Sequence, residues 1–154
     1  MEKLKEKFME RFGIEHGKEF FSPGRVNLIG EHTDYNGGNV FPCAIDKGTF
    51  ALVKKREDNK FRMYSENFEH LGVVEFYLEK LENEKEHDWA NYPKGVIKMF
   101  LDGGYRIDRG FDVLFHGNIP NGAGLSSSAS IEIATAIILK DLFQLDIEMT
   151  EMIK

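Results

Sequence analysis

The feature that most constrains the fold is a glycine-rich turn that runs directly into the start of a helix, at residues 120–130. Gly122 and Gly124 lack a Cβ atom, so the backbone there can turn tightly and approach an anion closely. The helix predicted from about Ser127 to Phe143 has N–H groups in its first turn without partners inside the helix. Its dipole is positive at that end, so the segment favours phosphate binding.

This turn differs from two other phosphate-binding loops. No Gly-Lys-Ser/Thr sequence follows it, as a Walker A loop requires, and Ser127 stands where a dinucleotide fingerprint has its third glycine. Ser126, Ser127 and Ser128 add hydroxyls that can donate to phosphate oxygens or ligate Mg²⁺. Because short glycine motifs are frequent, a turn that only caps a helix is an equally good interpretation of this segment taken alone.

A second polar cluster, at residues 24–35, suits a ligand with many hydroxyls. Glu31 and Asp34 can accept hydrogen bonds from a sugar, and His32 between them can donate or accept. Arg25 is placed to stabilise charge on a transferring phosphoryl group. The alternatives are an exposed polar turn and a surface salt bridge, whereas a metal site is disfavoured because no second histidine has ligand spacing. Together the two clusters predict a kinase that phosphorylates a sugar-like alcohol.

Length and composition exclude several other classes. The 154 residues suffice for one domain with a core, and the net charge of −6 argues against a nucleic-acid surface. Cys43 is the only cysteine, so no intrachain disulfide can form and a reducing cytoplasm is the expected location. The charged N-terminus lacks the apolar stretch of a signal peptide, and residues 131–139 are too short and too polar to cross a membrane.

Hydrophobic periodicity predicts an alternation of helices and strands. The amphipathic segment 2–12 ends at Gly13, and a strand over 18–29 is interrupted at Pro23-Gly24, with Arg25 and Asn27 on one face and Val26 and Leu28 on the other. Charge density makes 79–88 a solvated surface segment. The remaining predicted elements are strands at 39–45, 49–55, 60–65, 73–78 and 111–115 and a helix at 89–101.

Trp89 at a helix start has two interpretations. A core anchor is favoured over a wall of an adenine pocket, in which Asn91 and Tyr92 would join it. The histidines His16, His70, His87 and His116 are isolated in sequence and predict no site.

Three segments resemble a known family. Residues 22–36 resemble the galactokinase signature, and residues 122–130 resemble the second motif of the wider GHMP kinases. Residues 89–96 also resemble a galactokinase segment. The matching order covers nearly the whole chain, and the first motif is the more selective because it carries the sugar contacts.

The resemblance implies an α/β (α+β) N-terminal domain like domain 2 of ribosomal protein S5, with a mixed sheet packed by helices. It implies transfer of phosphate from ATP to D-galactose, giving galactose 1-phosphate and ADP. Glu31, His32 and Asp34 would hold sugar hydroxyls, Thr33 and Tyr35 would shape the same loop, and Arg25 would stabilise charge. The residues implied to wrap the nucleotide phosphates are Gly122, Ala123, Gly124, Leu125, Ser126, Ser127 and Ser128, with Ser128 also a Mg²⁺ ligand.

The end of the chain bears on activity. Thr150 and Glu151 resemble a helix start four residues before Lys154, so residues 1–154 are expected to be the N-terminal domain of a longer protein, without its C-terminal domain. In the family, a magnesium-binding glutamate, a catalytic aspartate and a third motif would lie beyond Lys154. The 154 residues alone are therefore expected to have little or no kinase activity.

Other functions fit the same residues. They are a galactose- and ATP-sensing regulator, a kinase for N-acetylgalactosamine or galacturonic acid, and a scaffold without a ligand. The oligomeric state is left open by the sequence.

Overall fold

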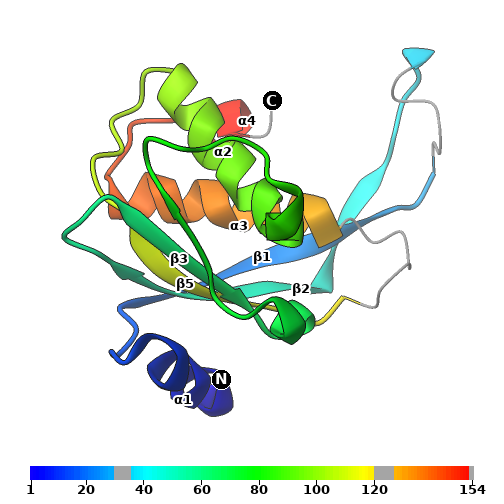
Figure 1. Ribbon diagram of the computed structural model, residues 1–154. Coiled ribbons are helices and arrows are strands. Elements are labelled where there is room, and N and C mark those ends of the chain that lie inside the picture. The colour runs from blue at the N-terminus through cyan, green and yellow to red at the C-terminus, as the bar shows by residue number, and fades with distance from the viewer. Residues whose placement is uncertain (30–35, 120–126, 153–154) are drawn as a thin grey trace.

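The computed structural model describes residues 1–29, 36–119 and 127–152, and is organised around one mixed five-stranded sheet (Figure 1). The strands are β1 (Lys18–Asn27), β2 (Pro42–Lys55), β3 (Lys60–Ser65), β4 (Val74–Tyr77) and β5 (Phe111–Gly117). Their order in the sheet is β1-β2-β5-β3-β4, so the last strand in sequence occupies the centre. Only the β3–β5 pair is parallel among the pairs described, which confirms the predicted mixed sheet.

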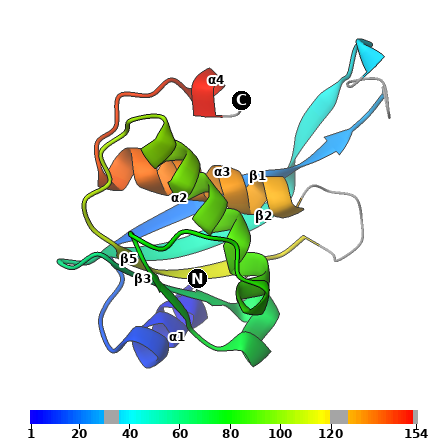
Figure 2. The same ribbon diagram turned by 45° about the horizontal axis from the view of Figure 1, so that its top comes forward.

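Helices cover both faces of this sheet. α2 (Asn91–Asp102) and α3 (Ser127–Leu142) lie together on one face, and α1 (Glu2–Phe12) lies on the other, as Figures 1 and 2 show from two directions. The short elements are the 3-10 turns η2 (Glu66–Leu71) and η3 (Lys85–Ala90) and the helix α4 (Met149–Met152).

Alternation along the central strands supplies the two cores. Phe111, Val113 and Phe115 of β5 are buried in the larger core, against α2 and α3. Leu114, between them in sequence, is buried in the smaller core with Leu52 of β2. Side chains of successive strand residues point to opposite faces, so the same strand contributes to both layers.

The first helix forms as its sequence predicts. Leu4, Phe8 and Phe12 are its buried residues, and they pack in the smaller core. Their spacing of four places them along one stripe of a helix. Gly13 ends α1 in the left-handed conformation, with φ of 71°, which a residue without Cβ adopts readily.

The first two strands are longer than the sequence predicts. The strands predicted at 39–45 and 49–55 are one strand, β2, and the break predicted at Pro23-Gly24 is a register shift within β1. Gly48 pairs with Pro23, and a Cβ atom there would lie 2.0 Å from the Ser22 carbonyl oxygen. The glycine therefore permits the two backbones to meet at the irregularity, where the sequence pattern had indicated a break.

Beyond this irregularity, β1 and β2 project past the helices as a two-stranded arm (Figure 1). Val26 is half-buried and Leu28 is exposed, so the apolar face predicted for this strand is not covered by the rest of the described chain. Leu28, Ile29 and Phe41 are each more than half exposed, at 59%, 70% and 59%.

The prediction of a solvated segment at 79–88 is only partly correct. Leu81 packs against the larger core, and Glu84 and His87 are half-buried. The predicted helix at 89–101 begins at Asn91, because Trp89 and Ala90 belong to the preceding η3. Within residues 1–29, 36–119 and 127–152, no helix combines the length and apolar character needed to span a bilayer.

Candidate functional site

A cavity of about 290 Å³ lies between the first turn of α3 and the end of β5. It is lined by Thr49, Ser65, Asn67, Phe68, Asp88, Trp89, Tyr92, Phe115, Gly117, Ile119, Ser127, Ser128 and Ile131. The parallel strands β3 and β5 both end here, with Ser65 opposite Phe115 in the sheet. Ligands commonly bind at the carboxyl ends of strands in open sheets, so this position favours a binding site.

Asn67 fixes the strand-end side of the cavity. Its Nδ2 donates to the Gly117 carbonyl at 2.8 Å, and its Oδ1 accepts from the Gly117 N–H at 2.7 Å. Ser65 Oγ in turn accepts from the Asn67 N–H. These bonds connect η2 to the end of β5, so this wall is positioned by the backbone.

Ser130 connects the start of α3 to the first two strands. Its buried hydroxyl donates to the Ser22 carbonyl at 2.8 Å and lies 2.9 Å from Thr49 Oγ1. Ser22 is three residues before Arg25, and Ser130 is three residues after Ser127. The bond therefore holds β1, which carries Arg25, against the first turn of α3, which follows the glycine-serine turn.

Arg25 lies on β1 opposite Ala44, immediately after the register shift. Its side chain is exposed, and no ion pair to it is found among the described residues. An exposed guanidinium at this position can meet an anionic ligand, and the surface salt bridge considered from sequence is not found within residues 1–29, 36–119 and 127–152.

Trp89 packs as a core residue, and it also lines the candidate cavity. It is 3% exposed and packs with Phe68 and Phe115 at ring-centroid distances of 6.3 and 5.9 Å, as a core residue does. It also lines the cavity, and its buried Nε1 has no hydrogen-bond partner in the part of the chain that the structure describes. A buried indole N–H usually has an acceptor, so a ligand acceptor at this position would satisfy it.

Ser127 and Ser128 are the first residues of α3, and both are exposed at the cavity. This confirms that a helix begins at the predicted position. The other predicted site residues lie outside the described residues: Glu31, His32, Thr33, Asp34, Tyr35, Gly122, Ala123, Gly124, Leu125 and Ser126.

A metal ion would find few protein ligands among the described residues. No group of three or more histidine, cysteine, aspartate or glutamate residues is placed to hold one in residues 1–29, 36–119 and 127–152. Ser128 offers one exposed hydroxyl oxygen. Mg²⁺ retains several waters and takes phosphate oxygens, so a single hydroxyl here is compatible with Mg²⁺ bound mainly through a nucleotide.

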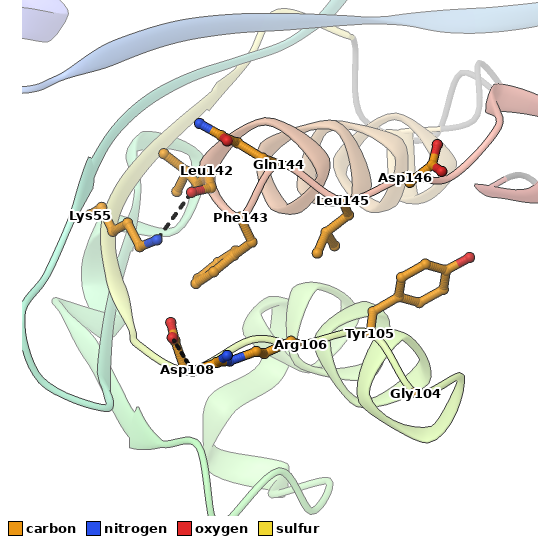
Figure 3. Close-up of a pocket in the computed structure, with 10 residues that line it drawn as sticks. All are labelled: Lys55, Gly104, Tyr105, Arg106, Asp108, Leu142, Phe143, Gln144, Leu145 and Asp146. Atoms are coloured by element: carbon orange, nitrogen blue, oxygen red, sulfur yellow. Dashed lines mark hydrogen bonds and ion pairs between the residues drawn. The ribbon is translucent and has the colours of Figure 1, made fainter.

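A larger cavity, of about 720 Å³, lies at the opposite end of α3 (Figure 3). It is lined by the segments that follow α2 and α3, with Lys55 donating to the Leu142 carbonyl at 3.1 Å and lying over the Phe143 ring. The 16 residues of α3 separate it from Ser127 by roughly 24 Å, at about 1.5 Å per residue. It contains none of the predicted site residues, so we assign the candidate site to the smaller cavity.

Several cavity residues were not identified from sequence. Thr49, Ser65, Asn67 and Asp88 each lie on a different element from the two motifs. The available signal was indirect: Ser65 ends the predicted strand at 60–65, and Asn67 follows it. This strand ends beside β5, which leads to the glycine-serine turn. The pairing of β3 with β5 brings them together across about fifty residues of sequence, which no local pattern reveals.

Family comparisons match both motifs. Residues 6–55 match the galactokinase galactose-binding signature, and residues 91–154 match the N-terminal domain of the GHMP kinases. Trp89 lies just outside both matched segments.

Curated relatives are similar along the whole chain. A galactokinase of Fusobacterium nucleatum is 68% identical over 155 residues, which covers 100% of this chain and 40% of that protein. A galactokinase of Clostridium beijerinckii is 61% identical over 98% of this chain and 39% of its own length. This chain therefore spans about two-fifths of the length of the relatives it matches.

The fold is also found in solved structures. A Lactococcus lactis galactokinase complexed with galactose superposes with a TM-score of 0.93 at 52% identity, over 98% of this chain and 39% of that one. A Methanococcus jannaschii mevalonate kinase shares the fold, with a TM-score of 0.73 at 24% identity over 90% of this chain and 44% of that one.

Proposed function

Because the chain belongs to the GHMP kinase family and corresponds to the N-terminal portion of a galactokinase, we propose that it contributes to phosphorylation of D-galactose by ATP. The products are galactose 1-phosphate and ADP. The proposed catalyst is a protein as long as the curated relatives, of which this chain forms one part. The observation that carries the proposal is the match of residues 6–55 to the galactose-binding signature. That segment contains Arg25 and the polar residues 31–35.

The cavity at the start of α3 is the proposed nucleotide site. Trp89 and Tyr92 would contact the adenine base, and the unpartnered Trp89 Nε1 gives the base site a hydrogen-bond donor. The phosphates would lie at the first turn of α3, where the N–H groups and the positive end of the helix dipole favour anions. Gly122, Ala123, Gly124, Leu125 and Ser126 precede this turn and would enclose the phosphates.

The proposed sugar site depends on the residues before β2. Glu31, His32 and Asp34 would hydrogen-bond the galactose hydroxyls, with Thr33 and Tyr35 shaping the loop. The Ser130 bond to Ser22 supports a sugar site next to the nucleotide site, because it holds β1 against the start of α3. Galactose and ATP would then bind on either side of this bond.

Phosphoryl transfer depends mainly on positioning and on stabilising negative charge. The exposed Arg25 guanidinium is proposed to stabilise charge on the transferring group near the sugar. Ser128 is proposed to ligate Mg²⁺, which neutralises phosphate charge when it is bound with ATP. The catalytic base is proposed to lie outside residues 1–154, and the proposed location of the protein is the cytoplasm.

Steady-state ADP release tests this function in a protein of the relatives' length that carries this chain. We expect ATP turnover that depends on galactose and on Mg²⁺, and a higher kcat/KM for galactose than for N-acetylgalactosamine or galacturonic acid. Calorimetric binding of galactose without turnover would instead support a sensing regulator. Absence of both sugar and nucleotide binding would overturn the proposal in favour of a scaffold.

A further inference from the structure

Lys94 is a buried residue on α2, close in sequence to the cavity residues Trp89 and Tyr92. Its side chain is 1% exposed, although it carries an ammonium group and lies on α2 two residues after Tyr92. Lysine is almost never fully buried unless it is paired. The ammonium has three donors, and the structure supplies three acceptors.

All three acceptors come from the segment that leads to Trp89. Lys94 Nζ donates to the Glu82 carbonyl at 2.9 Å and to Glu84 Oε1 at 3.2 Å, and it lies 2.6 Å from His87 Nδ1. The ring of Phe76 lies 5.0 Å from the same nitrogen, which adds a cation–π contact. The buried Lys94 side chain thus contacts three residues of the segment 82–87.

The contact with His87 determines the state of the imidazole. An ammonium group donates and cannot accept, so His87 Nδ1 must carry a lone pair and its proton must be on Nε2. A protonated imidazole would have an N–H at Nδ1, and the bond with Lys94 could not form. The Lys94–His87 bond therefore exists only while His87 is neutral.

The segment held by Lys94 has an unfavourable backbone conformation. Asp88, between His87 and Trp89, has φ of 43° and ψ of −115°, outside the regions that non-glycine residues prefer. Such residues persist when the surrounding contacts fix them. Asn91 adds two such contacts, because its Oδ1 accepts from the Glu84 N–H at 3.1 Å and its Nδ2 donates to the Glu84 carbonyl at 2.7 Å.

We propose that Lys94 is a positioning residue for the nucleotide base, acting through neutral His87 to hold Asp88 and Trp89 in the wall of the cavity. The proposal rests on the nucleotide site described above. Protonation of His87 breaks the bond with Lys94, releases the strained turn and moves Trp89. Nucleotide affinity consequently falls in mild acid, although neither Lys94 nor His87 contacts the nucleotide.

The charges around His87 determine the direction of this effect. Burial and the Lys94 ammonium lower the pKa of His87 below its ordinary value of 6.5, and Lys80 acts in the same direction. Glu84 and Glu86 oppose this shift, and Glu84 Oε1 lies 3.7 Å from Nδ1. Phe76 of β4 is the uncharged neighbour, with its ring 6.2 Å from the imidazole. His87 therefore stays neutral near pH 7 and titrates below 6.5.

The first experiment follows Trp89 without any nucleotide. Trp89 is the only tryptophan of the 154 residues, so the intrinsic fluorescence of this chain reports on this side chain alone. We expect a change in emission as the pH falls below the ordinary histidine pKa of 6.5. His87→Asn places an uncharged acceptor at the same δ position, so it should abolish the transition while leaving the thermal midpoint near neutral pH close to that of the wild type.

His70→Asn is the matched control, because His70 packs on Phe68, which also contacts Trp89. It should keep the transition. A wild-type chain without an acid transition in Trp89 emission, or an unchanged transition in His87→Asn, would overturn the proposal.

The second experiment measures ATP binding by the same fluorescence signal. Lys94→Met keeps the length of the side chain but removes its donors, and we expect ATP affinity to fall about tenfold, the effect of losing buried hydrogen bonds. Lys98→Met, at an exposed position one turn further along α2, should bind ATP like the wild type. Equal loss in both variants, or no loss in Lys94→Met, would contradict the positioning role.

The two experiments separate the two proposals. Suppose that the wild-type chain shows the His87-dependent transition but a protein of the relatives' length does not bind ATP. The proposed function then fails, and the Lys94–His87 contact only determines the position of Trp89. If ATP binds at Trp89 but with the same affinity above and below the histidine pKa, the proposed function stands and the positioning role fails.

Discussion

Arg62 holds the buried carboxylate of Asp112 at two points across the parallel β3–β5 pair. Its Nε and Nη2 donate to the two carboxylate oxygens, each at 2.6 Å, and the Asp112 side chain is 0% exposed. Arg56 Nη1 donates to the same carboxylate at 3.0 Å. The ion pair therefore spans the one parallel strand pair among the described strands.

Asp112→Asn should destabilise the protein. Removing the carboxylate charge leaves Arg62 without its ion-pair partner and Arg56 with Asp58 alone. Breaking a buried ion pair costs about 3–5 kcal/mol, less here because both arginines retain solvent contact and Arg56 keeps one carboxylate. Urea unfolding should show a loss of about 2–4 kcal/mol. Asp108→Asn, an exposed control, should change stability by less than about 0.5 kcal/mol, and an equal effect of both substitutions would contradict the prediction.

A pair of glycine substitutions tests the irregularity between β1 and β2. Gly48→Ala should destabilise the protein, because the new Cβ atom would lie 2.0 Å from the Ser22 carbonyl oxygen and 2.8 Å from Pro23 Cα. Gly95→Ala, inside α2 and with no atom within 4 Å of the new Cβ, should stabilise by about 0.5–1 kcal/mol. Thermal unfolding of both variants checks the opposite signs, and a shared sign would refute the packing argument.

Arg25→Ala should reduce catalysis more than sugar binding. If the guanidinium stabilises transferring charge, kcat should fall by about 10²–10³-fold, the usual cost of losing one such group, while the KM for galactose changes less. The measurement is steady-state ADP release by a protein of the relatives' length. Lys18→Ala, at an exposed residue of the same strand, is the control and should retain the parent kcat. A fall confined to KM would assign Arg25 to sugar binding.

Acid should remove the contribution of Asp58. Hydrogen bonding from Arg56 lowers the pKa of Asp58 from 3.8 to about 2. The folded-state pKa is below the unfolded value, so the stabilisation is present above 3.8 and is lost as the pH falls towards 2. Asp58→Asn should therefore reduce the difference in unfolding free energy between neutral and acidic solution. Asp102→Asn is the exposed control, and an identical acid dependence in wild type and Asp58→Asn would disprove the linkage.

The sequence predicts the elements in which local periodicity and burial agree. α1 and β3 have the predicted bounds, and α3 begins at Ser127, because each has an apolar pattern of one period and a clear end. The sequence does not predict that β2 continues through Gly48, since the fit of that glycine against Ser22 depends on the neighbouring strand. Nor does it predict the burial of Lys94, whose three acceptors become available only after residues 82–88 fold over α2.

The candidate site shows the same division. Ser127, Ser128 and Trp89 line the cavity, and Arg25 lies on β1, the strand that Ser130 bonds to the start of α3. Their roles toward a ligand stay predictions. The supporting residues Thr49, Ser65 and Asn67 depend on strand pairing and carry no motif. The roles of residues 31–35 and 122–126 remain predictions from the sequence and from family similarity.

The central position of β5 also has a consequence for synthesis of the chain. β2 and β3 both pair with β5, yet they precede it by about fifty residues of sequence. A ribosome must release Phe111–Gly117 before either strand has its partner on the β5 side, although β1 and β4 can already pair with their other edges. Strands with unpaired edges associate readily with other chains. The growing polypeptide therefore passes through a stage in which the β2 and β3 edges that will meet β5 are unpaired and open to association with other chains.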